Sequence, residues 1–350
     1  MNLLARTALS LFALAACGRA PPSVLAELPP APAPEVNPTT PEKAELGRHL
    51  FYDVRLSQQR NVSCASCHQQ AHAFSDTVSL SVGTTGARTA RNSMSLVNSG
   101  YAATLTWFNP ILHDLEAQAL VPLVGEAPIE LGMANRDDLL RARLLSEPRY
   151  RELFTAAFPD QAEPYTMQNV AAALASFQRT LVSTRAPYDQ HTLSDAAQQG
   201  LALFESERLG CTSCHGGVFF SSAMSAQDAR PHFENNGLRA DYPPGHEGLR
   251  ELTGNANDLG KYKPPSLRNV ALTAPYMHDG SLATLDEVLE HYARGGLPSA
   301  TRSPHVKGFA LSAEERASLL AFFDSLTDEA LLRDPRFADP WSGLQLAVGQ

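Results

Sequence analysis

The chain has 350 residues, of which 43% are hydrophobic and 19% are charged, and its formal net charge is −9. These values describe a globular protein with enough apolar side chains for a core, and the length fits one large domain or two of ordinary size. The acidic balance argues against a nucleic-acid-binding protein, whose surface would be basic, and is compatible with a basic redox partner.

The first 17 residues have the features of a bacterial lipoprotein signal peptide. Arg6 supplies a positive charge, and the apolar stretch 8–16 is too short to span a bilayer. The motif LAAC places Cys17 where such a signal is cleaved and its cysteine acylated; an ordinary signal peptide with an incidental cysteine is the alternative. Residues 18–40 are rich in Pro and Ala and are predicted to be a tether. We therefore expect a periplasm-facing protein, anchored to the bacterial envelope at its outer membrane by lipid only.

Helical periodicity follows the tether. Residues 41–53 begin with Pro41, and proline is common at the first position of a helix. Residues 136–158 and 166–183 carry apolar side chains three and four positions apart, as amphipathic helices do. No strand-like alternation persists along the chain, so the sequence predicts an all-α fold.

Two cysteine pairs carry the most specific motif of the chain. Residues 64–68 read CASCH and residues 211–215 read CTSCH, so both are C-x-x-C-H. With five Cys and eleven His in the chain, two such strings do not arise by chance. A disulfide or a four-cysteine zinc site would not need a histidine after each pair, and a thioredoxin-like motif would need a βαβ context that is absent.

The spacing of the motif favours covalently attached c-type haem. On one helical turn, cysteines at i and i+3 share a face and can form two thioethers, and the next residue then brings its imidazole to the iron. We therefore predict two c-type haems, one attached through Cys64 and Cys67 with His68 as proximal ligand, the other through Cys211 and Cys214 with His215.

The second half of the chain repeats the layout of the first. Residues 195–215 again place a helix before a haem motif, and residues 312–326 form a further amphipathic helix in which Ser312 and Glu315 are a capping box. The repeat predicts two cytochrome c-like domains, each around one haem, and a tail that packs back on this body. Their expected ranges are 41–185, 186–330 and 331–350.

The order and spacing of several stretches resemble the bacterial di-haem cytochrome c peroxidase/MauG family over nearly all of the mature chain. These stretches are LGRHLFYDVRLS, VSCASCHQQAHAFSD, TARNSMSLVN, LEAQALVPLVGEAPIELG, GCTSCHGG and KPPSLRNVALTAPYMHDGSLATLDEVLEHY. Residues 105–132 look most similar to the MbnH-like branch of methanobactin operons, which resembles MauG in oxidising a partner protein.

The resemblance implies an oxidoreductase that uses hydrogen peroxide to form high-valent iron and oxidises an exported partner protein by long-range electron transfer. One alternative is a cytochrome c peroxidase that draws electrons from a small cytochrome c. Another is a non-enzymatic electron carrier with two closed haems. Both enzymes would need a haem iron with an open coordination position and acid–base groups above it. An electron carrier would need neither.

The resemblance places three residues over the open face of the first haem, namely Gln118, Pro122 and Glu130. Cleaving a peroxide requires a group that moves a proton from the inner to the outer oxygen, and a carboxylate such as Glu130 can do so. The distance from Pro122 to Glu130 is two residues longer than in the commoner family pattern, so Glu126 is a minor alternative. The loop 79–89 contains no histidine that could close this haem, so we expect it to be five-coordinate.

Trp107 matches the family's tryptophan between the two haems, which passes electrons; a plain core tryptophan is the alternative. MauG-type proteins also carry a surface-side tryptophan two positions before the second motif, as an exit for oxidising equivalents. Here that position is Leu209, so oxidising equivalents must leave by another aromatic side chain or directly from the haem edge.

The resemblance also implies a calcium ion between the domains. Asn92, Thr273 and Pro275 match its ligands, with one side-chain oxygen and two backbone oxygens, and calcium favours such oxygen ligands. The remaining candidate histidines are expected to pack or to contact haem propionates rather than iron; they are His72, His278 and His291.

Tyr292 is the predicted sixth ligand of the second haem. On periodicity alone it lies on an apolar helix face and would be a core residue. Yet it stands seventeen positions after Pro275, where the family's peroxidases place a methionine and MauG-like proteins a tyrosine. Met277 is the less favoured alternative for this sixth ligand. Thr284 and Glu287 form a capping box for this helix.

Overall fold

The computed structural model describes residues 28–342, and the regular structure in this range is helical. Extended segments there meet only in isolated bridges, so the predicted all-α fold is confirmed. The α-helices are α1 (Pro41–Tyr52), α2 (Cys64–Cys67), α3 (Leu115–Val124), α4 (Asp137–Leu145), α5 (Pro148–Ala157), α6 (Met167–Thr180), α7 (Asp195–Phe204), α8 (Arg250–Thr253), α9 (Leu285–Ala293), α10 (Ala313–Asp324) and α11 (Glu329–Leu332). The expected signal peptide and Cys17 lie outside the described residues.

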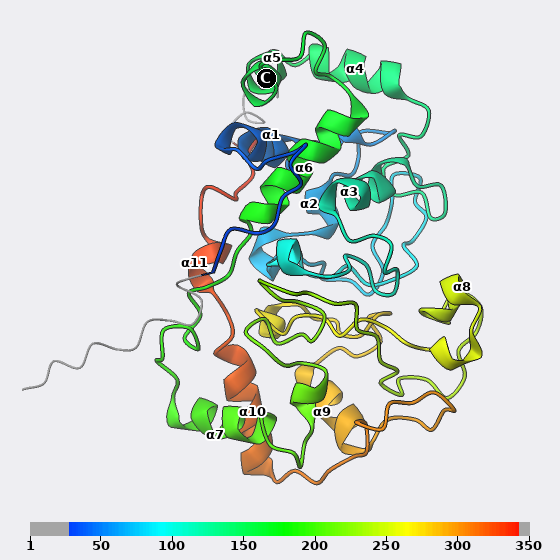
Figure 1. The fold of residues 1–350 in the computed structure, drawn as a ribbon, viewed down its shortest axis with the longest axis vertical. Coiled ribbons are helices and arrows are strands. Elements are labelled where there is room, and N and C mark those ends of the chain that lie inside the picture. Colours follow the sequence, from blue (N-terminus) through cyan, green and yellow to red (C-terminus); the bar gives the residue numbers. More distant parts are fainter. Residues whose placement is uncertain (1–27, 343–350) are drawn as a thin grey trace, which may run out of the picture.

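The helices form two domains, one above the other in Figure 1. The first domain contains α1 to α6, and the second contains α7 to α10. Each domain has its own cluster of buried apolar side chains. In the described part of the chain, no helix has the length and apolar character needed to cross a membrane.

In each domain two helices cross in close contact, and we call this pair of helices the frame of the domain. In the first domain α1 crosses α6, and a Cβ atom added to Gly47 would lie 2.0 Å from the backbone oxygen of Ala173. In the second domain α7 crosses α10, and a Cβ atom on Gly200 would lie 1.9 Å from the backbone oxygen of Ser318. Since real side chains cannot approach so closely, only glycine permits either crossing.

Local sequence signals set several helix ends as predicted. α9 begins with the capping box of Thr284 and Glu287, and α10 begins with that of Ser312 and Glu315. The periodic stretch 136–158 is divided into α4 and α5. Proline fits the first position of α5 but would break a continuing helix, which explains the division.

The described part of the predicted tether, residues 28–40, is bound to the first domain. It contains no helix, as expected, but the Tyr101 hydroxyl donates to the Pro29 carbonyl at 2.8 Å. Nε of Arg179 donates to the Pro32 carbonyl at 2.9 Å. The predicted tether therefore contacts the first domain over this range, because its backbone carbonyls accept donors from that domain.

The C-terminal segment also returns to the first domain. Nε1 of Trp341 donates to the His49 carbonyl at 2.9 Å, and the Tyr52 hydroxyl donates to the Phe337 carbonyl at 2.6 Å. Phe337 and Trp341 are buried in the first cluster of apolar side chains. The tail, as far as the structure describes it, thus packs on the body, and it packs on the domain that lies farther away in sequence.

Candidate cofactor and catalytic sites

The first C-x-x-C-H motif begins on α2, a single helical turn whose last bond joins the His68 amide to the Cys64 carbonyl at 2.9 Å. Nδ1 of His68 lies 2.9 Å from the Phe74 carbonyl. A carbonyl can only accept, so Nδ1 carries the proton and Nε2 keeps its free lone pair. Burial lowers the pKa of His68, which favours the neutral imidazole that a metal requires.

The second motif repeats this arrangement with small differences. The His215 amide donates to the Cys211 carbonyl at 2.9 Å, and Nδ1 of His215 lies 3.1 Å from the carbonyls of both Phe220 and Pro265. Burial lowers the pKa of His215 as well. The turn Cys211–Ser213 is a 3₁₀ turn rather than the α-helical turn found at Cys64. Both motifs thus present one imidazole nitrogen that is free to bind iron.

The four motif cysteines are free, with no disulfide between any of them. Burial raises the pKa of Cys64 and Cys214 to about 12, and that of Cys67 and Cys211 to about 11. Each pair is followed directly by a histidine with one free ring nitrogen, which is the donor set of a c-type haem attachment motif. The donor set therefore fits two covalent haems, as predicted.

Four buried nitrogen atoms near the domain boundary give a second test of this fit. Among the described residues, Nε of Arg91, Nε of Arg239, Nδ1 of His246 and Nε2 of His278 have no hydrogen-bond partner. Burial, together with the charges of Arg91, His246 and Arg239, lowers the pKa of His278 to about 3. Unpartnered donors in a cationic setting fit an anionic group, and the haem propionates expected beside His278 are such a group.

The same region contains a possible metal cluster that the sequence did not suggest. Ligand atoms of His246, His278 and Asp279 lie within 4.8 Å of one another. However, Arg239 Nη2 already pairs with the Asp279 carboxylate at 2.6 Å. Two neighbouring guanidinium groups would oppose a cation, so the cluster favours an anion.

Glu130 lies on the side of the first domain that faces the first motif. Its charge raises the pKa of both Cys64 and Cys67, and burial raises its own pKa. The Thr84 amide donates to the Glu130 carbonyl at 2.7 Å. A Cβ atom on Gly83 would lie 2.1 Å from the backbone oxygen of Ile129, so this glycine allows its loop to touch the loop that carries Glu130. The Glu130 backbone is thus fixed against the loop at Gly83, and its carboxyl lies near enough to the motif to affect both cysteines.

Gln118 and Pro122 lie one turn apart on α3 and therefore share a face of that helix. The loop after α3 folds back along it, because the Leu131 amide donates to the Pro122 carbonyl at 2.9 Å. This contact brings Glu130 next to the end of α3. Glu126 instead is exposed and lines a separate cavity of about 350 Å³.

Trp107 lies where the two domains meet. Its indole nitrogen donates to the Asn92 carbonyl at 2.8 Å, and the Asn92 amide donates to the His278 carbonyl at 2.9 Å. The Lys263 amide donates to the Trp107 carbonyl at 2.7 Å. The buried ammonium of Lys263 donates to the Thr104 carbonyl at 2.9 Å, and burial lowers its pKa to about 8. Both domains therefore fix the tryptophan, and no sequence motif had indicated Lys263.

The predicted calcium ligands lie at the same boundary. The Asn92 side chain donates to the carbonyls of Val78 and Ser79, each at 3.2 Å. Thr273 lies two positions before Pro275, and its hydroxyl donates to the Val270 carbonyl at 3.2 Å. The contact between Asn92 and His278 brings the first segment against the loop that follows Pro275. A calcium ion here stays a prediction.

Tyr292 on α9 faces the second motif together with Met277. Nδ2 of Asn236 lies 3.3 Å from the Met277 sulfur and 3.5 Å from the Tyr292 hydroxyl. Burial raises the pKa of Tyr292 to about 12, and the thiols of the motif add to this shift. Both candidates for the sixth ligand therefore meet at one amide. Sequence reasoning missed Asn236, because nothing local marks a residue that acts 56 positions away.

Two further predictions concern residues near this site. His291 is buried, and its Nε2 lies 3.0 Å from the Asn236 carbonyl, which agrees with a packing role. Leu209 is only 4% exposed and belongs to the second core. The position of the expected exit tryptophan is thus closed to the surface here.

Comparisons with known proteins agree on one group of relatives. A family model described as di-haem cytochrome c peroxidase matches residues 41–197. The methylamine utilization protein MauG of Methylorubrum extorquens is 38% identical over 91% of this chain and 86% of its own length. Cytochrome-c peroxidase IdrP1 of Denitromonas iodatirespirans is 35% identical over 97% and 96%, respectively. A crystal structure of a MauG-like protein associated with microbial copper homeostasis is 44% identical over 89% of this chain and 97% of its own, with a TM-score of 0.86.

Proposed function

The chain belongs to the di-haem cytochrome c peroxidase/MauG family, and from this membership we propose that it is a MauG-like enzyme that reduces hydrogen peroxide and oxidises a partner protein. Membership itself makes it an oxidoreductase with two c-type haems that uses peroxide. The observation that carries the proposal is the half-buried Glu130 carboxyl near the first motif. A simple electron carrier would have no use for an acid–base group there.

Cys64, Cys67, Cys211 and Cys214 would hold the two haems, with His68 and His215 as proximal ligands. When bound, the haems supply iron that gives two electrons to peroxide and keeps the resulting oxidising equivalents until a donor returns two electrons. Because the Nδ1 atoms of both histidines carry the proton, their Nε2 atoms stay unprotonated and can bind iron.

Glu130 is the proposed proton carrier. Its carboxylate takes the proton from the inner oxygen of peroxide and returns it to the outer oxygen, which then leaves as water. Gln118, on the neighbouring face of α3, orients the peroxide by hydrogen bonds, and Pro122 closes that face to water. Because burial raises the pKa of Glu130, its carboxylate is a stronger base toward the peroxide proton than an ordinary glutamate.

Trp107 is the proposed connection between the domains. Its indole is tied to the first domain through Asn92 and its carbonyl to the second through Lys263. A rigid aromatic ring at the boundary shortens the through-space steps for an electron that crosses between the haems. We also propose that calcium at Asn92, Thr273 and Pro275 stiffens this boundary.

The second domain decides between two modes of action. With Tyr292 as ligand, a phenolate would lower the haem potential and favour oxidation of a partner protein. With Met277, a thioether would raise the potential and suit a cytochrome c peroxidase fed by a small cytochrome c. Cytochrome c peroxidase activity is the second candidate function, because the Met277 sulfur lies as close to Asn236 as the Tyr292 hydroxyl does.

We place the enzyme on the periplasmic side of the envelope, at the outer membrane, with lipid on Cys17 as its only membrane attachment. The partner would then be an exported protein. The 44% identical relative is associated with copper homeostasis, which supports a copper-related partner among the candidates.

The test is a substitution of the proton carrier. Glu130→Gln keeps the shape but removes the ionisable group, so the peroxide-driven spectral change should slow by about 10²–10⁴-fold, with the dependence on peroxide concentration little changed. In the parent enzyme this rate should also fall as the pH drops through the raised pKa of Glu130, since the protonated acid cannot accept a proton.

Glu126→Gln is the matched control, because Glu126 lies in a separate cavity, and it should react at the parent rate. Stopped-flow spectra of the matured proteins measure both. A parent rate in Glu130→Gln together with a slow Glu126→Gln would move the role to Glu126.

A further inference from the structure

If the chain works as proposed above, oxidising equivalents must travel from the second motif to a donor outside the protein. Leu209 cannot serve as their exit, because it is aliphatic and 4% exposed. An aromatic side chain that touches both the motif and the surface can serve instead.

One pair of aromatic rings meets this requirement. Nδ1 of His215 donates to the Phe220 carbonyl at 3.1 Å. The Phe220 ring meets the Tyr188 ring edge to face, with centroids 5.0 Å apart. Phe220 is 4% exposed, whereas Tyr188 is half-buried. One hydrogen bond and one ring contact therefore join the proximal ligand to a partly exposed phenol.

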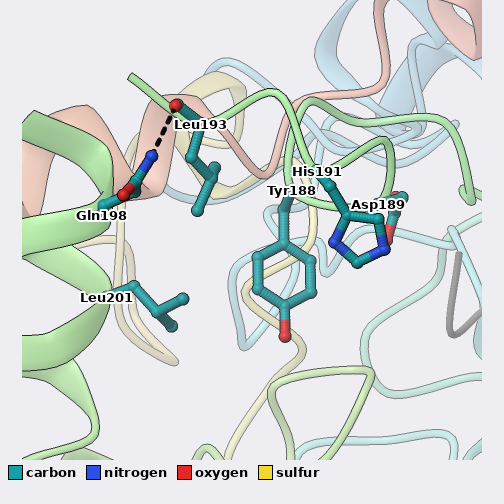
Figure 2. A pocket seen from close by; sticks show the side chains of 6 residues that line it. All are labelled: Tyr188, Asp189, His191, Leu193, Gln198 and Leu201. Atoms are coloured by element: carbon teal, nitrogen blue, oxygen red, sulfur yellow. Dashed lines mark hydrogen bonds between the residues drawn. The ribbon is translucent and has the colours of Figure 1, made fainter. Parts of the chain in front are cut away.

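Tyr188 reaches a surface cavity of about 310 Å³. Its lining residues are Tyr188, Asp189, His191, Leu193, Gln198 and Leu201. Figure 2 shows the Tyr188 ring standing between His191 and Leu201, and none of the other lining residues drawn binds its hydroxyl. The hydrogen bond drawn there joins Gln198 to the Leu193 carbonyl. Water in the cavity can therefore take up the phenol proton.

A buried ion pair packs against the two rings, and its two charges compensate each other. The Arg268 guanidinium lies 5.3 Å from the centroids of both Tyr188 and Phe220. An uncompensated cation at this distance would oppose the removal of an electron. Asp189 compensates it through contacts of 2.7 and 2.8 Å, and both side chains are at most 1% exposed.

We propose that Tyr188 is the relay through which oxidising equivalents leave the second domain. Tyr188 loses one electron to the oxidised second domain and its hydroxyl proton to water in the cavity, which leaves a neutral tyrosyl radical. An oxidisable aromatic side chain of the partner protein then gives one electron to Tyr188, and a proton from water restores the phenol. Two such cycles return the two electrons that one hydrogen peroxide consumed.

The test traps the radical without any partner. The full holoprotein is mixed with hydrogen peroxide and the spin trap 2-methyl-2-nitrosopropane, and peptide mass mapping locates the adduct. The parent protein should carry the adduct on Tyr188. Tyr188→Phe should lose it while keeping the parent rate of the peroxide-driven spectral change, and its oxidised state should decay more slowly.

Tyr276→Phe is the matched control. Tyr276 is also half-buried in the second domain, but its hydroxyl donates to the Val270 carbonyl and it does not line the cavity. The control should keep the adduct on Tyr188. An adduct on another aromatic residue of the parent, or an unchanged yield in Tyr188→Phe, would overturn the relay while leaving peroxide reduction intact. If the parent shows no spectral change with peroxide, the proposed function fails and the relay fails with it.

Discussion

The two domains share one frame but differ in the side chains that lie near the haem motif. In both, a glycine crossing joins two helices, and a histidine donates its Nδ1 proton to the carbonyl of a phenylalanine, Phe74 or Phe220. Beyond that frame, the first domain places the carboxyl of Glu130 near its motif, and the second places Tyr292 and Met277 near its own. The proximal half of each site is therefore repeated, and the added loops make the two sites chemically different.

The largest effect should come from breaking one frame at a time. Gly47→Ala and Gly200→Ala each force a Cβ atom to within about 2 Å of a backbone oxygen, so each should lower the free energy of unfolding by about 3 kcal/mol or more. Hydrogen exchange should locate the loss in the substituted domain alone.

Gly86→Ala is the control for these variants. Nothing lies within 4 Å of a Cβ atom there, although its φ is +87°, so the cost should be only about 1 kcal/mol. If Gly47→Ala loosened α7 and α10 as much as α1 and α6, the two frames would not be independent.

A second substitution tests which side chain makes the second site different from the first. Tyr292→Phe removes the hydroxyl but keeps the ring, and the Met277 sulfur beside Asn236 is then the remaining donor. The resting ferric protein should gain the near-infrared sulfur-to-iron band, which the parent should lack. If the parent already shows this band, the second domain is methionine-ligated and cytochrome c peroxidase is the better description.

The smallest effect concerns the ion pair between Glu116 and Arg179 in the first domain. Burial raises the pKa of the Glu116 carboxyl, but hydrogen bonds from Arg179 and Asn37 outweigh it and hold the pKa below its usual range. Such a group stabilises the fold above its ordinary pKa and loses that effect as the pH falls through the lowered value. Glu116→Gln should therefore reduce the free energy of unfolding by about 1–2 kcal/mol at pH 7, and by less below about pH 4.

Urea unfolding at both pH values measures this difference. Glu163→Gln, which breaks the exposed pair with Arg141, should cause no measurable change because solvent screens that pair. A Glu116→Gln loss that stays constant between the two pH values would show that packing, rather than charge, joins α3 to α6.

The sequence was most informative where the signal is local. The C-x-x-C-H strings and the capping boxes at Thr284 and Ser312 each lie within a few residues, and the structure has the expected turns there. Contacts between distant segments were not predictable. Asn236 meets Tyr292 across 56 positions, and Arg179 meets Pro32 across 147, and no periodicity encodes such pairs. The site residues taken from the family resemblance needed the fold to bring Glu130, rather than Glu126, to the first motif.

The return of Phe337 and Trp341 to the first core has a consequence for the order of biosynthesis. A ribosome makes the first domain early, yet two of its core side chains are added last. The indole that binds the His49 carbonyl cannot arrive until the whole second domain has been made. Cys64 and Cys67 thus belong to a domain whose core is complete only when the whole chain is present.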